Sequence, residues 1–316
     1  MSKELKKLSV IFMGTPDFAV PILQTLIDNT NVVLVVSQPD AVVGRKKELR
    51  ETSVKKLAKV NNIPVFQPIK IKEDYDTVIN MQADIIITCA YGQIIPKIIL
   101  DFPQLGCINV HASLLPNLRG GAPIHKALID GYDKTGITIM YMDEKMDTGD
   151  IISQEEYFIK DSDNVGNLHE KLSAIGASLL LKTLPSIINN TNLRIKQDDA
   201  MATYAYNIKR EEEKINFNNP SKDIFNQVRG LNPWPLAFTK INDLEIKVIE
   251  CDYIEHEQKN EAGIIVKITK EKLGISSQDG TIYITKLKPF GKKEMLVKDY
   301  LNGINKEELL NKKIGE

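Results

Sequence analysis

Short apolar runs recur along the first half of the chain, each closed by turn residues and followed by a helical pattern, and few folds are compatible with that rhythm. The clearest runs lie at residues 8–13, 32–36, 83–90 and 107–111. Each has the length of a buried strand, and apolar residues at helical spacing return between them. Strands that alternate with helices over short connections predict a parallel sheet with right-handed crossovers. We therefore expect an α/β domain at the start of the chain.

The pattern changes in the second half. A long helical pattern at 164–184 ends in a run rich in asparagine, and loop composition continues to about residue 208. Beyond it, short strands follow one another closely with glycine or Asp-Gly turns between them, which is typical of a small all-β domain or barrel. The sequence thus predicts three segments, which are a first domain at 1–189, a linker at 190–208 and a second domain at 209–316.

The composition excludes several classes of protein. The 316 residues carry 41 Lys or Arg and 42 Asp or Glu, so the net charge is −1 and any site for a polyanion must be a local patch. No apolar run approaches the ~18 residues that a membrane-spanning helix needs, and no apolar signal core follows the N-terminus, so we expect a cytoplasmic protein. Three widely spaced cysteines predict buried thiols, and the four histidines lack ligand spacing, so we expect neither a disulfide nor a metal site.

The strand predicted at 107–111 ends in polar residues. Because side chains alternate along a strand, Asn109 and His111 point to the same face, and Pro116 marks the point where the chain leaves the sheet. The next strand leads to a turn that holds Asp147. An amide donor, an imidazole and a carboxylate together suit addition to a carbonyl-type carbon and collapse of the tetrahedral species. From the residues alone, ordinary loop polarity explains these positions as well.

A covalent enzyme intermediate is not expected. Ser113 lacks the Gly-x-Ser-x-Gly elbow of a serine nucleophile. Nothing in the sequence supports Cys107 as a thiol nucleophile, although its position leaves that role open. Direct transfer between two bound substrates is therefore favoured.

The densest positive stretch of the chain lies between Arg45 and Lys59. A flexible basic loop beside a cleft could hold phosphates, because neutralising the backbone charge supplies much of the affinity for nucleic acids. A solvated loop and helix face would explain the same residues.

Several motifs resemble those of the folate-dependent formyltransferases. The core of the match is Asn109-x-His111, followed by Ser113–Pro116, Arg119–Ile124 and Met146–Asp150. Further motifs resemble the members of that family that act on an aminoacyl-tRNA; they are Gly14–Ala19, Gln38–Asp40, Ala90–Gly92, Thr203–Ala205 and Asn232–Pro235. Nearly the whole chain is covered.

The resemblance implies an α/β protein with a Rossmann-like parallel-sheet N-terminal domain and a smaller C-terminal β-barrel similar to the OB fold. It implies transfer of a formyl group from 10-formyltetrahydrofolate, as donor co-substrate, to the α-amino group of methionine esterified to initiator tRNA. By the same match, Asn109 polarises the formyl oxygen, His111 steadies the tetrahedral oxyanion and moves protons, and Asp147 sets the charge state of His111.

The resemblance also implies binding residues. The folate would lie against Ser113, Leu114, Leu115 and Pro116, with Tyr91 and Gly92 near the pterin. The basic loop would approach the tRNA acceptor arm through Arg45, Lys46, Lys47 and Arg50. No long amphipathic seam is left over for a partner, so we expect a monomer.

Other functions compete with this one. A formyltransferase that acts on an amino-sugar nucleotide would share the central block, whereas one that acts on a purine precursor is disfavoured because such enzymes resemble only the first domain. A non-catalytic RNA-binding protein on the same frame belongs to a different class. The intact set of Asn109, His111 and Asp147 argues against it.

Overall fold

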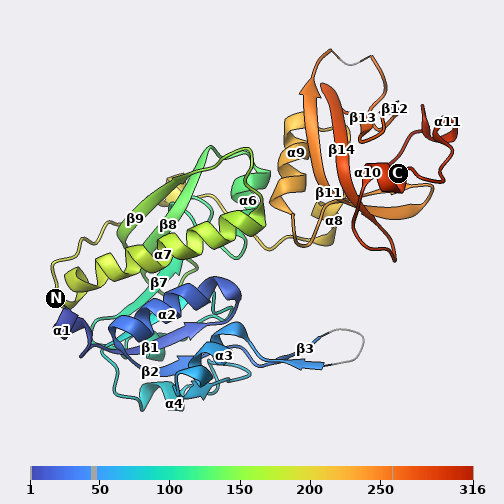
Figure 1. Ribbon diagram of the computed structural model, residues 1–316. Coiled ribbons are helices and arrows are strands. Elements are labelled where there is room, and N and C mark those ends of the chain that lie inside the picture. The colour runs from blue at the N-terminus through green and yellow to red at the C-terminus, as the bar shows by residue number, and fades with distance from the viewer. Residues whose placement is uncertain (1, 44–47, 258, 316) are drawn as a thin grey trace. The chain divides into compact units, whose positions relative to one another are not determined.

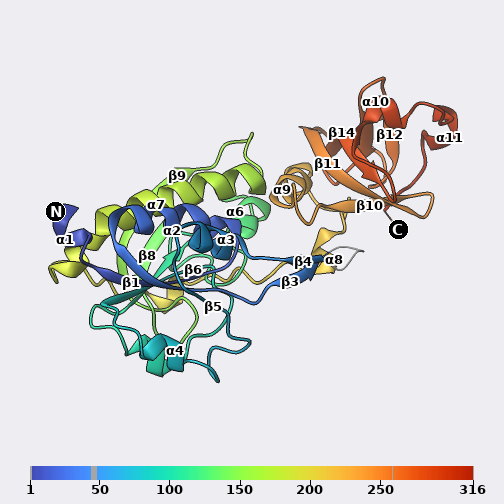
Figure 2. The same cartoon turned by 60° about the horizontal axis from the view of Figure 1, so that its bottom comes forward.

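The computed structural model describes residues 2–43, 48–257 and 259–315, and Figures 1 and 2 show it in two orientations. The chain divides into two compact units. Unit 1 comprises residues 1–123, 134–158 and 169–206, and unit 2 comprises residues 124–133, 159–168 and 207–316. Two short segments before residue 190 are thus grouped with the C-terminal part, while the functional division at 1–189, 190–208 and 209–316 stays a prediction.

Unit 1 is built on one sheet whose strands lie in the order β5-β2-β1-β6-β7-β8-β9. The strands from β5 to β7 pair in parallel, and β8 and β9 add an antiparallel edge. Their bounds are β1 Ser9–Gly14, β2 Asn31–Val36, β5 Val65–Phe66, β6 Ile85–Cys89, β7 Cys107–His111, β8 Lys134–Tyr141 and β9 Ile151–Phe158. The α/β fold expected from the apolar runs is confirmed.

The strand order of this sheet reverses at β1. Strands β2 and β5 lie on one side of β1, and β6 to β9 lie on the other. In open α/β sheets, ligands bind outside the carboxyl ends of the strands at such a switch point. The strand ends at this point are Gly14 of β1 and Cys89 of β6, and the end of β7 lies next to them in the sheet.

Helices cover both faces of the sheet. Helices α2 and α7 lie on one face and α4 on the other (Figures 1 and 2), and a core cluster joins α4 and α5 to the sheet through Val78 and Ile99. The helices and remaining strands of unit 1 are α1 Ser2–Leu5, η1 Asp17–Ala19, α2 Val20–Asn29, α3 Ser53–Val60, α4 Asp76–Ile79, α5 Lys97–Leu100, α7 Val165–Ile188 from residue 169 on, η2 Asp199–Met201 and the hairpin β3 Ala41–Val43 with β4 Glu48–Arg50.

Helix α7 belongs to the core. Among the described residues it is long and apolar enough to cross a membrane, but its side chains Leu172 and Leu184 are fully buried inside the protein. A Cβ at Gly176 would lie 3.1 Å from Val110 of β7 and 3.7 Å from Ile137 of β8, so the helix backbone rests directly on the sheet. The apolar surface of α7 is therefore the surface of a core helix.

Unit 2 is built on an antiparallel sheet with the order β10-β11-β14-β13-β12, and β15 pairs with β14. The pairing of β11 with β14 shifts register on both sides of Glu250, so the ladder is irregular there. The sheet curls around one hydrophobic core (Figure 1), so the smaller β domain expected from the sequence is confirmed. The strands are β10 Phe238–Ile241, β11 Leu244–Glu255, β12 Ile265–Ile268, β13 Leu273–Ser276, β14 Gly280–Pro289 and β15 Met295–Leu296.

Helices pack against the sheet and core of unit 2. Their bounds are α6 Pro123–Ile129, α8 Arg210–Glu213, α9 Ser221–Gly230, α10 Val297–Tyr300 and α11 Lys306–Leu309. In α6, His125 Nδ1 lies 2.8 Å from the carbonyl oxygen of Gly230, and its ring meets Trp234 edge-on. Burial lowers the pKa of His125. This histidine is therefore a packing residue of unit 2.

Candidate active site

The end of β7 presents two polar side chains to one face of the sheet. Val110 packs against α7 on the opposite face, whereas the thiol of Cys107 lies 3.4 Å from Ile99 O on the α5 side. The alternation of strand side chains therefore places Asn109 and His111 on the α5 side as well. His111 is 6% exposed and Asn109 is partly exposed.

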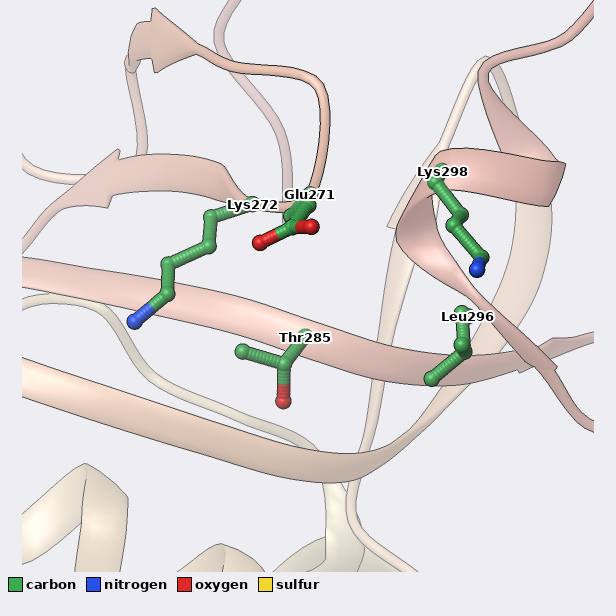
Figure 3. A pocket seen from close by; sticks show the side chains of 5 residues that line it. All are labelled: Glu271, Lys272, Thr285, Leu296 and Lys298. Atoms are coloured by element: carbon green, nitrogen blue, oxygen red, sulfur yellow. The ribbon is translucent and has the colours of Figure 1, made fainter.

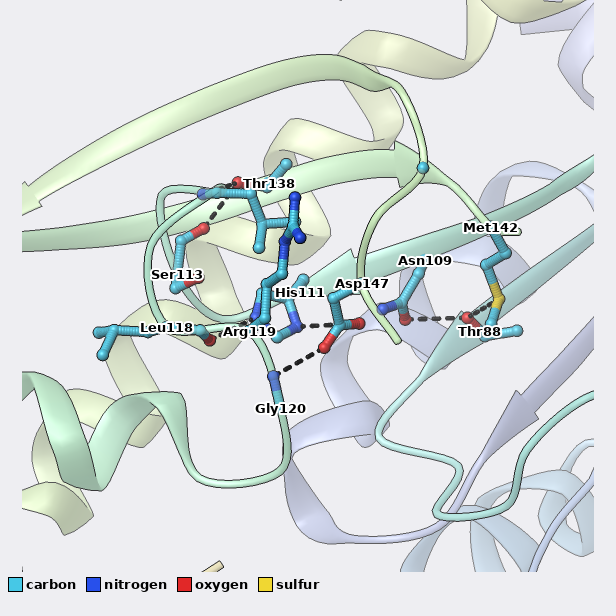
Figure 4. Close-up of polar contacts among 12 residues, drawn as sticks. Thr88, Asn109, His111, Ser113, Leu118, Arg119, Gly120, Thr138, Met142 and Asp147 are labelled. Carbon is cyan, nitrogen blue, oxygen red and sulfur yellow. Dashed lines mark hydrogen bonds and ion pairs between the residues drawn. The ribbon is translucent and has the colours of Figure 1, made fainter. Parts of the chain in front are cut away.

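Asp147, from the turn after β8, faces the imidazole of His111 (Figure 4). His111 Nδ1 lies 3.6 Å from Asp147 Oδ1, and both side chains are largely buried. On the other side of the ring, Nε2 lies 3.1 Å from the carbonyl oxygen of Leu118. A carbonyl oxygen only accepts, so Nε2 carries a hydrogen and Nδ1 is the ring atom left to exchange a proton.

The backbone conformation of the turn that carries Asp147 restricts which residues fit there. Asp147 has a φ of +55°, a left-handed conformation in which Asp and Asn are among the more tolerated residues. A Cβ at Gly149 would lie 1.9 Å from the carbonyl oxygen of Tyr141, so only glycine fits there. The second carboxylate oxygen of Asp147 accepts from the backbone N–H of Gly120 at 2.8 Å. The carboxylate is thus held between a ring nitrogen and a backbone amide.

Asn109 is oriented by Thr88 of the neighbouring strand β6. The Thr88 hydroxyl, 2% exposed, donates to Asn109 Oδ1 at 2.8 Å. Because its oxygen is engaged, the side-chain nitrogen of Asn109 points away from Thr88 and toward Asp147 (Figure 4). The amide therefore offers its N–H groups to the space in front of the strand end.

Arg119 and Gln197 connect the turn that carries Asp147 to the loop that ends near residue 200. Arg119 is 1% exposed, and its Nε and Nη2 donate to Gln197 Oε1 at 3.1 and 2.9 Å. Gln197 Nε2 in turn donates to the carbonyl oxygens of Asp147 and Gly149 at 2.9 and 2.8 Å. Arg119 also forms an ion pair with the exposed Asp199. Sequence reasoning missed Gln197, since it lies in a stretch of loop composition and belongs to no motif.

Replacing Gln197 with glutamate should loosen this turn. The carboxylate still accepts from Arg119, but it presents an acceptor to two carbonyl oxygens that then lack a donor. Leaving such groups unpaired costs about 1–3 kcal/mol, so we expect that loss in the free energy of urea unfolding and a roughly tenfold lower turnover. The control, Lys196→Ala, alters the exposed residue next to Gln197 and should change both by little. If Gln197→Glu kept wild-type stability and turnover, Gln197 would not be needed to hold the turn at Asp147 and Gly149.

The predicted folate segment, residues 113–116, forms a tight turn. Ser113 is fully buried and its hydroxyl donates to the carbonyl oxygen of Asn117 at 2.6 Å. Leu115 lies in the same turn and is buried, with 3% of its surface exposed. The accessible residues of the segment are therefore Leu114 and Pro116. Contact of this segment with folate stays a prediction.

Tyr91 and Gly92, predicted to lie near the pterin, follow the end of β6 at the switch point. The carbonyl oxygen of Tyr91 accepts from Thr15 Oγ1 at 3.0 Å and from Gln38 Nε2 at 3.2 Å, which ties the ends of β1, β2 and β6 together. Gly92 has a φ of +89°. Burial raises the pKa of Tyr91 to about 12, and its hydroxyl finds no hydrogen-bond partner within the described residues.

The predicted tRNA-binding residues are only partly visible. Arg45, Lys46 and Lys47 lie outside the described residues. Arg50 ends β4 of the β3–β4 hairpin and is exposed. Its role in binding tRNA stays a prediction.

The cysteines do not act as nucleophiles in this geometry. All three are free and buried. Burial raises the pKa of Cys107 to about 12 and raises the pKa of Cys89 and Cys251 as well. A thiolate at neutral pH is thus disfavoured at each position. No cluster of side chains suited to a metal ion occurs among the residues that the structure describes.

Unit 2 contains a cavity of about 220 Å³ lined by residues of both charges. Figure 3 shows Glu271, Lys272 and Lys298 around it. Lys272 is already paired with Asp252 at 2.6 Å. The mixed charge gives this cavity no clear preference for an anion.

Comparison with known proteins assigns the family. A family model for formyl transferase matches residues 6–184, and a model for the formyl transferase C-terminal domain matches residues 207–305. The chain is 50% identical over 306 residues to the methionyl-tRNA formyltransferase of Staphylococcus epidermidis, with 96% of this chain and 98% of the relative covered. It is 47% identical over 308 residues to that of Staphylococcus aureus, with 96% and 99% covered.

Solved structures share the fold. A sugar 3N-formyl transferase, WlaRD, in the presence of dTDP and 5-N-formyl-THF superposes with a TM-score of 0.66 at 24% identity, covering 90% of this chain and 99% of that one. HypX from Aquifex aeolicus in complex with tetrahydrofolic acid gives a TM-score of 0.63 at 14% identity, covering 95% and 48%. Fold and matched domains are those of a formyltransferase. The chain belongs to the family of methionyl-tRNA formyltransferases.

Proposed function

We propose that this chain transfers the formyl group of 10-formyltetrahydrofolate to the α-amino group of methionine esterified to initiator tRNA, the formylation used in translation initiation. The observation that carries the proposal is the convergence of Asn109, His111 and Asp147 at the end of β7. The names of relatives at 47–50% identity support methionyl-tRNA as the acceptor.

The reaction needs a donor for an oxyanion. The α-amine attacks the formyl carbon, a C–N bond forms, and the carbonyl electron pair moves onto oxygen. The side-chain N–H of Asn109 can donate to that oxygen, because Thr88 already engages the amide oxygen. When the tetrahedral species collapses, the bond to the folate nitrogen breaks. That nitrogen gains a proton and the former amine loses one, so no covalent enzyme intermediate is required.

His111 is placed to carry this proton through Nδ1. Its Nε2–H is bound to Leu118, which fixes the ring, and Asp147 faces Nδ1. Only a neutral amine can attack, and a free α-amino group titrates near ~7.7–8.0, so the amine must lose a proton before or during attack. Asp147 would compensate the charge of the imidazole when both ring nitrogens carry a hydrogen.

The donor fits the switch point of the sheet. The backbone at Tyr91 and Gly92 lies at the end of β6, next to the end of β7 that carries Asn109 and His111. Open α/β sheets bind ligands at this position. We place the pterin near Tyr91 and Gly92 and the rest of the folate along the turn formed by Ser113, Leu114, Leu115 and Pro116.

The acceptor is a polyanion, and the protein has almost no net charge. We therefore assign its approach to the local basic stretch that includes Arg45, Lys46, Lys47 and Arg50, on charge alone. A cytoplasmic location and a monomeric state, both expected from the sequence, belong to the same proposal.

The proposed function is tested by offering labelled 10-formyltetrahydrofolate with methionyl initiator tRNA, elongator methionyl-tRNA or an amino-sugar nucleotide. We expect formylation of the methionyl initiator tRNA in preference to the other two acceptors. Transfer to the amino-sugar nucleotide alone would establish that alternative. Binding of RNA without transfer to any acceptor would indicate a non-catalytic RNA-binding protein.

A further inference from the structure

Two tyrosine rings stack on each other at the surface of unit 1. The centroids of Tyr204 and Tyr206 lie 5.9 Å apart, and the ring planes differ by 7°. Tyr204 is 49% exposed and Tyr206 is 62% exposed. Aromatic rings contribute most when they are buried, so two parallel rings kept in water form a surface suited to another planar group.

The backbone explains why both rings share one side. The carbonyl oxygen of Thr203 accepts from Arg119 N at 2.9 Å, and Ala205 N donates to the carbonyl oxygen of Arg119 at 2.7 Å. The segment is therefore extended along the Arg119 peptide, and its side chains alternate. Ala205 is fully buried. Tyr204 and Tyr206 consequently point together to the opposite side.

Backbone contacts between segments remote in sequence join the tyrosine pair to the candidate active site. The Arg119 peptide, on which the segment is paired, is followed by Gly120, whose N–H binds the carboxylate of Asp147. A Cβ at Gly120 would lie 2.7 Å from the carbonyl oxygen of Ala205, so the two strands of backbone are in direct contact. The backbone of Arg119 and Gly120 is therefore in contact with both the tyrosine segment and the carboxylate of Asp147.

We propose that Tyr204 and Tyr206 form a stacking platform for the nucleobase of the 3′-terminal nucleotide of the aminoacyl-tRNA. This inference rests on the proposed function and extends it. In such a substrate the reactive amine is joined, through the amino acid and its ester, to the ribose of that nucleotide. The base must therefore lie about one nucleotide away from the reacting carbon. Unpaired ends of RNA are recognised largely by stacking on aromatic side chains.

A nucleobase fits this platform better than the other groups in the reaction. The platform itself consists of two uncharged rings, so it offers stacking to a base and no cation to a phosphate. The pterin of the donor is planar as well, but the proposed function already assigns it to the switch point near Tyr91 and Gly92. An exposed platform matches the end of a polymer that enters from solvent.

The experiment compares Tyr204→Ala, Tyr206→Ala and the double variant with Tyr204→Phe and Tyr206→Phe, all in the full chain. We expect the double alanine variant to raise the KM for methionyl-tRNA by roughly 5- to 100-fold, since base–aromatic stacking is lost. The KM for 10-formyltetrahydrofolate should stay within about twofold, and the phenylalanine variants, which keep the rings, should behave as wild type.

A second measurement reports stacking directly. Methionyl-tRNA that carries 2-aminopurine as its 3′-terminal base should lose fluorescence on binding the wild type and the phenylalanine variants, but not the double alanine variant. Phe158→Ala serves as the control, because Phe158 is an aromatic residue of the same unit that is 68% exposed at the end of β9. Thermal melting shows that each variant is folded.

The outcomes separate this inference from the proposed function. An unchanged KM for tRNA in the double alanine variant, with formylation intact, overturns the platform and leaves the function standing. A rise confined to the KM for folate assigns the rings to the pterin and overturns the platform as well. Absence of formylation by the wild type overturns the function instead, and the aminopurine signal then decides the platform by itself.

Discussion

Replacing Asp147 with asparagine is expected to lower kcat for formyl transfer by about 10²–10³, while the KM for 10-formyltetrahydrofolate stays within about twofold. The carboxylate lies 3.6 Å from Nδ1 of His111, and its removal takes away the negative charge that faces this nitrogen. Asparagine has nearly the same shape, tolerates the φ of +55°, and can still accept from Gly120. The measurement is steady-state kinetics with donor and acceptor varied in turn.

The same turn offers a matched control for this variant. Asp150 is also a carboxylate, and it forms a surface ion pair with Arg194 at 3.0 Å. Asp150→Asn removes the same charge from the turn without touching the imidazole, so turnover should change by no more than about twofold. Equal losses of turnover and folate affinity in Asp147→Asn would show that Asp147 shapes the folate site and would refute its assigned role.

Replacing Asn109 with aspartate is expected to lower kcat by about 10³ or more. Loss of a single oxyanion donor costs about 10²–10³ in kcat, and the new carboxylate adds a negative charge where negative charge develops in the reaction. The Thr88 hydroxyl still finds an acceptor in aspartate, so the strand end should keep its structure. Single-turnover assays at saturating donor and acceptor would isolate the chemical step.

Two further measurements show whether a loss of turnover in Asn109→Asp comes from the oxyanion donor, from added charge or from misfolding. Asn189→Asp, at the exposed end of α7, changes the net charge by the same amount and should leave turnover unaffected. Thermal melting of Asn109→Asp should be close to wild type. A variant that melts normally and retains more than a tenth of wild-type turnover would remove Asn109 from the role of oxyanion donor.

Part of the site was predictable because it depends on local alternation. The five residues of β7 read as a buried strand, and a strand places every second side chain on the same face. The sequence alone could therefore place Asn109 and His111 on the same face of the strand. Asp147 could not, since its position depends on the antiparallel pairing of β8 with β7, where Thr138 lies opposite His111. The residues alone offered it only as a carboxylate in the following turn, and its role came from the resemblance to a family.

The strand rhythm also left strand direction open at the edge of the sheet. Apolar runs predicted a parallel sheet, and β1, β2, β5, β6 and β7 are parallel. Strand β8 runs in the opposite direction and pairs antiparallel with both β7 and β9, and the turn at 142–150 returns the chain directly beside β8. Periodicity reports which residues are buried, and it carries no information on strand direction.

The sequence by itself determined the α/β class, the smaller β domain, the strand ends and the pair formed by Asn109 and His111. Only the tertiary structure decided that Arg119, a residue type normally exposed, is buried and hydrogen-bonded to Gln197 beside the Asp147 turn, and that two tyrosines stack on each other. The physical reason is the range of the interactions. Amphipathic periodicity is a local property of a segment, whereas hydrogen bonds between remote loops exist only after the sheet register has brought those loops together.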